Sequence, residues 1–290
     1  MSGFQPDPPL TYLDVLDQIA ASGYAGTELG DWGFMPDDPL VLRPELERRG
    51  LSMIGAFTPV ELTDPAAYPE AESTALRAAR LLAACSSADS EPGPYVILAA
   101  DASRHPDRRQ AAGRVKLKDG LSEPEWEALT RGANAIARAV LDETGVRTVF
   151  HPHCGTPVET MAETKRLAEA TDPLLVGLCF DTGHVAYAGD DPAAWLAAFA
   201  ERIRLVHFKD MDSRVAQDSR KKEWDYGCAV RSGLFTELGN GDVNFRSVHK
   251  ELVKSGYEGW IVVEDEIPPG LVPPFEAAKR DREFLRGLGL

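Results

Sequence analysis

The feature that most constrains the fold is a regular alternation, along the whole chain, of short apolar runs with segments of helical periodicity. Several apolar runs are nearly continuous and rich in Val, Ile and Leu, which is typical of strands covered on both faces of a parallel sheet. Strands that alternate with helices are joined by right-handed crossovers into such a sheet. The predicted strands cover residues 26–29, 52–57, 95–100, 147–153, 176–181, 203–209 and 260–264.

Helix start and stop signals occupy the gaps between these runs. Thr11 can cap a helix that stops at Gly23, and the capping-box pattern Ser122-Glu-Pro-Glu125 opens a long helix that ends near Gly145. A chain of 290 residues suits one large α/β domain better than two ordinary ones. The prediction is therefore a single domain over residues 1–290, with the α/β fold of a TIM (β/α)8-type barrel.

The first strand of that barrel is missing or degenerate. A closed barrel has eight strands, whereas the sequence offers seven apolar runs, and the first predicted helix already begins near residue 11. Residues 1–10 contain three prolines and no apolar run, so they make a poor central strand. Either they form an irregular plug in which Phe4 fills the empty space, or the natural protein begins upstream and carries one more strand. We expect the second arrangement.

Composition excludes several classes of function. The net charge of −15 argues against nucleic-acid binding, which needs a basic surface. No run of about 18 apolar residues is present, and the N-terminus lacks the pattern of a secretory signal, so we expect no membrane contact. The four cysteines show no CxxC spacing and no disulfide framework. Reduced thiols in a cytoplasmic protein are the expected state.

Ionisable side chains gather at the carboxyl ends of the predicted strands, where barrel enzymes keep their active sites. Four of the six histidines fall in or just after these segments, which scattered surface histidines would not do. Carboxylates and imidazoles on different strands around a ring form a plausible divalent-metal site, and such donors suit Mn, Mg, Co, Zn or Fe. The residues concerned are Glu28, His151, His153, Asp181, His184, His207, Lys209 and Glu264.

Six short motifs occur in order from about residue 10 to the end of the chain. They are Gly23–Leu29, His151–Thr156 with Val158–Thr160, Phe180–His184, His207–Asp210, Leu238–Asp242, and Gly256–Trp260 continuing to Glu264. Together they resemble the xylose-isomerase-like TIM barrel superfamily of sugar phosphate isomerases and epimerases. Within it, the chain is most similar to the inosose dehydratase branch.

The resemblance implies one divalent metal ion, held by Glu, Asp, His and Glu from successive strands. Asp181, His207 and Glu264 match three of these positions. Where many relatives have the first glutamate, this chain has His151, and Glu159 follows shortly after it. The fourth ligand is therefore His151 or Glu159, with Glu159 able to supply the missing carboxylate. Mn, Co, Mg and Zn all remain open.

The resemblance also implies a reaction. A proton next to a carbonyl is removed, while a metal ion acts as Lewis acid on the carbonyl oxygen. We expect an isomerase or epimerase acting in this way on a small sugar or cyclic polyol that carries a carbonyl group. The alternatives are a dehydratase, which would remove water from a keto-inositol, and a non-catalytic sugar-binding relic of the barrel. Many proteins of the superfamily dimerise, so a homodimer is an expected assembly.

Individual roles follow from this chemistry. His151 and His153 are the candidates for proton transfer. Lys209 could steady a developing oxyanion, or could simply form an ion pair with a neighbouring aspartate. Glu28 and His184 could bind substrate hydroxyls, or could make structural hydrogen bonds.

Two further segments are candidates for substrate contact. Residues 211–235 form a long polar stretch without clear periodicity, which predicts a lid or binding loop. Within it, Trp224 and Tyr226 could cover a sugar face. The glycine-rich pattern at residues 238–242 could approach the substrate through its backbone or could be a plain turn.

Overall fold

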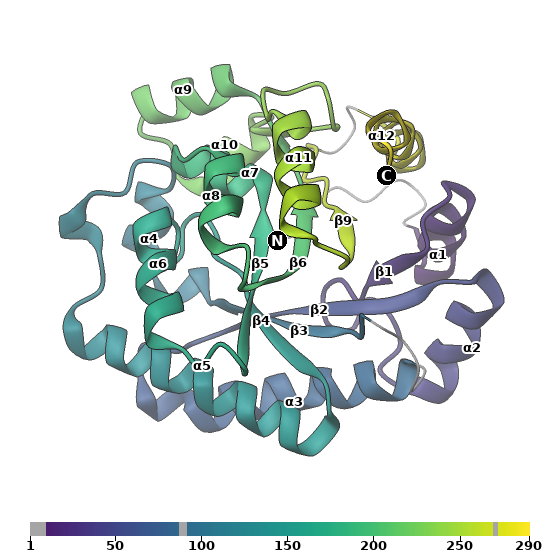
Figure 1. Ribbon diagram of the computed structural model, residues 1–290, viewed down its shortest axis with the longest axis horizontal. Helices are drawn as coiled ribbons and strands as arrows, with labels where there is room; N and C mark the ends of the chain where they lie inside the picture. Colours follow the sequence, from purple (N-terminus) through teal and green to yellow (C-terminus); the bar gives the residue numbers. More distant parts are fainter. Residues whose placement is uncertain (1–9, 87–91, 269–271) are drawn as a thin grey trace.

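Seven parallel strands form the centre of the molecule, in a computed structural model that describes residues 10–86, 92–268 and 272–290. Their order in the sheet is β1-β2-β3-β4-β5-β6-β9, and the sheet curves into a nearly closed barrel with helices outside it (Figure 1). This confirms the predicted TIM-barrel fold. The strands are β1 Gly26–Glu28, β2 Ser52–Val60, β3 Tyr95–Ala100, β4 Arg147–Phe150, β5 Val176–Asp181, β6 Ile203–Phe208 and β9 Ile261–Val263.

All seven predicted strands are present, with shifts at their ends. β4 stops at Phe150, not at His153, because the chain turns there and the His153 amide donates to the Val158 carbonyl at 2.9 Å. β2 continues three residues further than predicted, to Val60. The strand ends that carry polar side chains therefore lie at the predicted edge of the barrel, and several of those side chains follow directly after a strand.

The helices begin where the sequence signals them. Capping boxes at Thr11 and Ser122 start α1 and α5, and Gly145 ends α5 in the left-handed conformation. The α-helices are α1 Tyr12–Ala21, α2 Pro39–Arg49, α3 Tyr68–Cys85, α4 Pro106–Ala111, α5 Glu123–Thr144, α6 Met161–Ala170, α7 Thr182–Ala188, α8 Pro192–Phe199, α9 Ser213–Lys221, α10 Tyr226–Arg231, α11 Phe245–Ser255 and α12 Pro274–Leu288. Within the described ranges, none of them is long and apolar enough to cross a membrane.

The barrel wall is open between its first and last strands. In the part of the chain that the structure describes, β1 pairs only with β2, and β9 pairs only with β6. A first strand would lie between them, and the described residues supply none there. The Phe4 plug was assigned to residues 1–10, and of these residues 1–9, including Phe4, lie outside the described residues.

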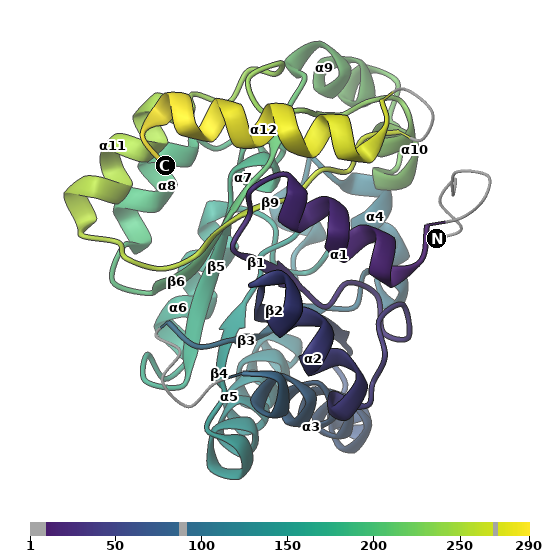
Figure 2. The same cartoon turned by 90° about the vertical axis from the view of Figure 1, so that its right-hand side faces the viewer.

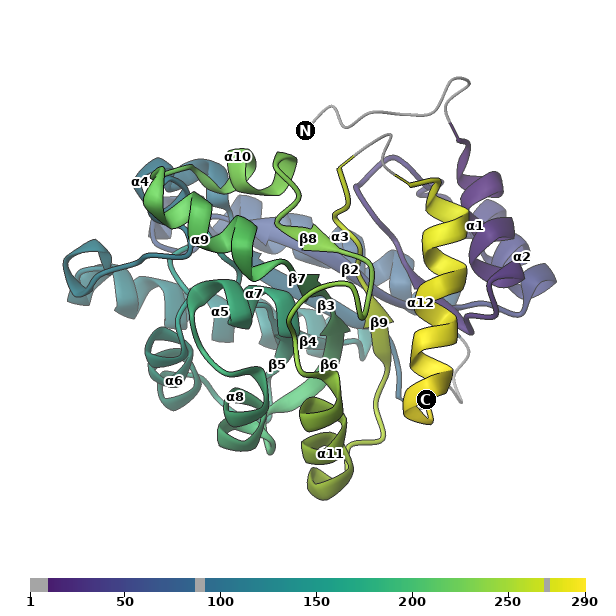
Figure 3. The ribbon, with the colours of Figure 1, turned by 90° about the horizontal axis from the view of Figure 1, so that it is seen from above.

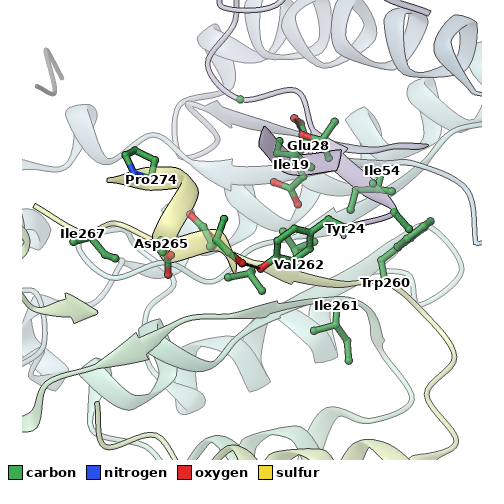
Figure 4. Close-up of a pocket in the computed structure, with 18 of the residues that line it drawn as sticks. Ile19, Tyr24, Glu28, Ile54, Trp260, Ile261, Val262, Asp265, Ile267 and Pro274 are labelled. Carbon is green, nitrogen blue, oxygen red and sulfur yellow. Dashed lines mark hydrogen bonds between the residues drawn. The ribbon is translucent and has the colours of Figure 1, made fainter. Parts of the chain in front are cut away.

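We call the opening between β1 and β9 the seam. A cavity of about 740 Å³ lies in it. Figure 4 shows Ile19, Tyr24 and Ile54 on the β1 side of the cavity and Trp260 and Val262 on the β9 side. Helices α1 and α12 lie side by side over the seam (Figure 2). The cavity reaches Glu28 and Glu264, so it touches the predicted site from the side.

Two apolar layers sandwich the sheet. The large outer layer packs the strands against the surrounding helices. The small inner layer fills the barrel below the strand ends and forms the floor of the predicted site. Its buried members are Tyr95, Ile97, Val149, Cys179 and Leu205, with Trp260 and Val262 packed against them.

The prediction of a long irregular loop at residues 211–235 is wrong. The segment contains α9, α10 and a short antiparallel pair, β7 Asp210–Met211 with β8 Phe235–Thr236. Asp212 and Asp225 cap the two helices through their carboxylates. Each helix is shorter than three turns, so its periodicity is too brief to detect in the sequence. The helices lie beside α4 at the mouth of the barrel (Figure 3).

Candidate active site

Four donor groups converge at the carboxyl ends of four strands. They belong to His151 after β4, Asp181 at the end of β5, His207 in β6 and Glu264 after β9, and one ligand atom of each lies within 4.8 Å of the others. Strand register explains the convergence, because Asp181 is directly opposite His207 in the β5–β6 pair. The group could hold a divalent metal ion, and it includes all three residues that the resemblance carried over.

An orphaned carboxylate oxygen supports a cation at this point. The Oδ1 atom of Asp181 accepts from the Gly183 and His184 amides at 2.8 and 2.9 Å, which caps α7. The other oxygen, Oδ2, is buried without a hydrogen-bond partner, and so is Nδ1 of His151. Buried polar atoms are rarely left unpaired. The free Asp181 oxygen, with Nε2 of His151 3.7 Å away and two further ligands beside it, therefore fits a divalent ion.

The His207 ring is held from both sides by carboxylates. Its Nδ1 lies 2.8 Å from Glu264 Oε2, and its Nε2 lies 2.8 Å from Glu28 Oε1. Burial alone would lower the pKa of His207, but Cys179 and the Glu28 carboxylate hold that pKa well above its ordinary value. The position therefore favours positive charge, which an imidazolium or a metal cation can supply. Glu28 thus lies at the site, bonded to a candidate ligand.

Lys209 is a fully buried cation beside the donor group. Its Nζ lies 3.2 Å from Glu264 Oε1, 3.3 Å from Glu266 Oε2 and 3.8 Å from Asp181 Oδ2. Burial opposes the charge, yet these three carboxylates raise the pKa of Lys209 above its ordinary value. A Cβ at Gly183 would lie 2.6 Å from the lysine stem, so glycine leaves the space that this stem occupies. The geometry fixes an ammonium donor at the site.

Two neutral imidazoles lie on the other side of Lys209. The His153 and His184 rings are 3.9 Å apart between centroids, and His184 Nε2 lies 3.4 Å from Lys209 Nζ. Burial and the neighbouring His151 lower the pKa of His153 to about 4, and burial lowers the pKa of His184 well below its ordinary value. Both rings can therefore accept a proton or a hydrogen bond at neutral pH.

Glu159 lies away from the donor group. Its carboxylate accepts from the Gly113 amide at 2.8 Å and from the Gly155 amide at 2.7 Å. Both oxygens are thus used to join two loops. Of the two residues considered for the fourth ligand, the structure brings His151 to the group and leaves Glu159 outside it.

The aromatic residue at the mouth of the site is Tyr226, not Trp224. Tyr226 packs 5.3 Å from the His153 ring centroid and donates to Glu266 Oε2 at 2.9 Å. Trp224 packs in the apolar cluster of α9 and α10, with Lys222 Nζ lying 4.9 Å from its ring centroid. The structure therefore does not bring Trp224 to the donor group.

The glycine-rich segment 238–242 is a turn that binds Asp210. The Asp210 carboxylate accepts from the Gly239 and Gly241 amides at 2.8 and 2.9 Å, and from Val243 at 3.1 Å. A Cβ at Gly241 would clash with Asp210 Oδ1, which excludes other residue types there. The contacts of this segment are therefore those of a plain turn, with its amides bonded to Asp210.

Three residues near the site were missed by the sequence analysis. Glu266 contacts both Lys209 and Tyr226, and its even spacing from Glu264 was the available signal. Phe57 in β2 lies 5.9 Å from the His151 ring centroid and is 41% exposed, although it stands in a buried strand. Cys179 forms part of the floor, two residues before Asp181 on the same face of β5.

Comparison with known proteins places the chain in a family. Residues 16–288 match the model of the xylose isomerase-like TIM barrel. The chain belongs to this family. It is 35% identical to an inosose dehydratase of Geobacillus kaustophilus, over 95% of this chain and 86% of that protein. It is 34% identical to an inosose dehydratase of Clostridium beijerinckii, over 95% of this chain and 89% of that protein.

Solved structures agree on the fold. A fusion protein of a xylose isomerase-like TIM barrel with a 4-hydroxyphenylpyruvate dioxygenase superposes with a TM-score of 0.72 at 18% identity. The superposition covers 96% of this chain and 41% of the fusion protein. The family match and the two inosose dehydratases confirm the expected superfamily and branch. The chain is a TIM-barrel enzyme of that superfamily.

Proposed function

We propose that this chain is a metal-dependent dehydratase that removes water from a keto-inositol. The observation that carries the proposal is the donor group of His151, Asp181, His207 and Glu264, in a chain 35% identical to an inosose dehydratase over nearly its full length. The sequence alone put isomerase or epimerase chemistry first. The relatives favour the dehydratase, because both relatives described above carry that name.

The four donors would hold the ion, and a bound divalent ion would supply Lewis acidity at the substrate carbonyl oxygen. Lys209, fixed by three carboxylates, is placed to donate a hydrogen bond to negative charge that develops on that oxygen. This arrangement lowers the barrier to removing a proton from the adjacent carbon.

His153 and His184 are the residues that could move protons. Each is a buried neutral imidazole at neutral pH, as a general base must be. One ring would take the proton from the carbon next to the carbonyl. The hydroxyl on the following carbon would then leave with a proton, and a carbon–carbon double bond would form. The balance is one water lost from each substrate molecule.

Phe57 offers a surface for the substrate ring. Its side chain is 41% exposed at the mouth of the barrel, and its ring lies 5.9 and 6.1 Å from those of His151 and His153. One face of a cyclic polyol carries mainly C–H groups, which pack well on an aromatic ring. We propose that Phe57 takes the role first assigned to Trp224. Glu28 would bind a hydroxyl or orient His207.

The alternative function is isomerisation or epimerisation of a keto-sugar. The same base and oxyanion donors serve both reactions, and the outcome depends on whether a hydroxyl lies beta to the carbonyl and can leave. The name of the matching family model, xylose isomerase-like TIM barrel, supports keeping this alternative.

The test is a substrate screen with two readouts. Protein loaded with Mn²⁺ or Co²⁺ is incubated with inososes and ketoses in deuterated water. We expect deuterium exchange next to the carbonyl and a dehydrated, ultraviolet-absorbing product from an inosose. Exchange with ketoses but no dehydration of any inosose would favour the isomerase. If neither reaction occurs with the metal bound, the protein is not an enzyme of this type. The non-catalytic, sugar-binding alternative would then remain. Asp181→Asn serves as the inactive control.

A further inference from the structure

The floor of the barrel contains a sulfur donor that the proposed function does not use. Cys179 is fully buried in β5, two residues before Asp181, so both side chains project into the barrel interior. Asp181 lies at the mouth and Cys179 lies one layer deeper. The sulfur therefore sits directly beneath the carboxylate site.

Two of the four donors described above also face this sulfur. One ligand atom each from His151, Cys179 and His207 lie within 4.8 Å of one another, and all three residues are buried. Nδ1 of His151, which is 2% exposed, is buried with no hydrogen-bond partner. A cysteine whose sulfur lies within 4.8 Å of a ring nitrogen of each of two buried histidines is more than an isolated buried thiol.

The two overlapping donor sets differ in chemical softness. Asp181 and Glu264 provide the oxygen ligands that Mg²⁺ and Mn²⁺ prefer, while a thiolate selects Zn²⁺ and other soft ions. His151 and His207 belong to both sets. We propose that His151, Cys179 and His207 form a second, deeper binding position for thiophilic divalent ions such as Zn²⁺, Co²⁺ or Cd²⁺. This position exists whether or not the chain dehydrates inositols.

Ion binding at this position has a simple balance. The cation replaces the thiol proton, one metal–sulfur bond forms, and the proton leaves to solvent. Because His151 and His207 cannot serve both positions at once, occupancy of the deeper position competes with an ion held by Asp181 and Glu264. The site would thereby discriminate between metals, and Zn²⁺ would displace Mn²⁺.

The test uses Co²⁺, whose spectrum reports sulfur ligation without any assay of activity. Chelator-treated protein is titrated with Co²⁺ and followed in the near ultraviolet, where cobalt–thiolate bonds absorb. We expect this band in the wild-type chain and in Cys154→Ser, which removes the other cysteine beside the site histidines. We expect it to be absent in Cys179→Ser and in Cys179→Ala.

A parallel measurement of affinities separates this proposal from the first. In Cys179→Ser the Zn²⁺ affinity should fall by at least about tenfold, with the Mn²⁺ affinity within about twofold of the wild type. Unchanged Mn²⁺ binding also shows that the variant is folded. Co²⁺ bound without the band, or a band that survives in both Cys179 variants, would overturn the deeper position and leave the carboxylate site standing. No Co²⁺ binding at all would contradict both.

Discussion

The closed wall and the open seam of the barrel hold their donors in different ways. On the wall, β5 and β6 are paired directly, and Asp181 is opposite His207 with its side chain 0% exposed. At the seam, β1 and β9 are not paired with each other in the described part of the chain, and the Glu264 side chain is 37% exposed. Glu28 and Glu264 reach the site by holding the two nitrogens of His207. Main-chain pairing therefore fixes the wall donors relative to each other, whereas the two seam carboxylates are linked across the unpaired gap through the His207 side chain.

The largest expected effect comes from removing the wall carboxylate. Asp181→Asn should lower Mn²⁺ affinity and turnover by more than about 100-fold, since it removes a ligand oxygen from a site with no solvent to replace it. The asparagine oxygen can still cap α7, so the fold should remain. The measurement is Mn²⁺ titration with a circular-dichroism spectrum as the folding control.

Glu264→Gln is the matched variant at the seam. Its effect on Mn²⁺ affinity should be smaller, about 10- to 100-fold, because water can approach this partly exposed side chain. A loss at Glu264→Gln equal to or larger than that at Asp181→Asn would break the comparison between wall and seam.

Core truncations should show the same contrast between wall and seam in the free energy of unfolding. Leu178→Ala in β5 removes a fully buried side chain and should cost about 3–5 kcal/mol of unfolding free energy. Ile261→Ala in β9 removes a partly buried one and should cost less than about 2 kcal/mol. Denaturant unfolding of both variants gives the comparison. Equal costs would mean that the seam is packed as tightly as the wall.

The smallest effect on the site is expected at Glu159. Glu159→Gln should leave Mn²⁺ affinity within about twofold of the wild type, since this carboxylate joins two loops outside the donor group. His151→Gln should lower that affinity at least about tenfold. If Glu159→Gln lowered Mn²⁺ affinity more than His151→Gln does, Glu159 would be the fourth ligand instead of His151.

Glu159 should also make the stability of the protein depend on pH. Burial raises the pKa of Glu159 from 4.5 to about 7. Between these values the native state keeps a proton that the unfolded chain releases, so wild-type stability falls as the pH rises, by on the order of 3 kcal/mol. This decline should be absent in Glu159→Gln. Denaturant unfolding at pH values from 4.5 to 7 checks it, and parallel curves would contradict it.

The sequence predicted where the strands begin better than where they end. Continuous apolar runs mark strands covered on both faces, so β3, β5 and the start of β6 were found at their true positions. Strand parity then grouped Asp181, His207 and Glu264, because parity is a local property. The short, half-buried β9 was the least accurate strand at its start, since Trp260 packs in the inner layer without being in the strand.

Other parts of the site depend on contacts between distant segments. Glu159 and His151 are both polar residues after β4, and only the loop geometry assigns the Glu159 oxygens to the Gly113 and Gly155 amides. Trp224 and Tyr226 are both aromatic and two residues apart, yet the capping of α10 by Asp225 turns Tyr226 toward the site. Neither outcome has a signal in local sequence.

Metal stoichiometry tests the central claim most directly. Chelator-treated protein is titrated with Mn²⁺ under electron paramagnetic resonance, which separates free from bound ion. We predict about one tightly bound Mn²⁺ per chain in the wild type and none in Asp181→Asn at the same concentrations. Wild-type protein that binds no Mn²⁺ or Co²⁺, or Asp181→Asn that binds it as tightly as the wild type, would contradict a metal centre built on this donor group.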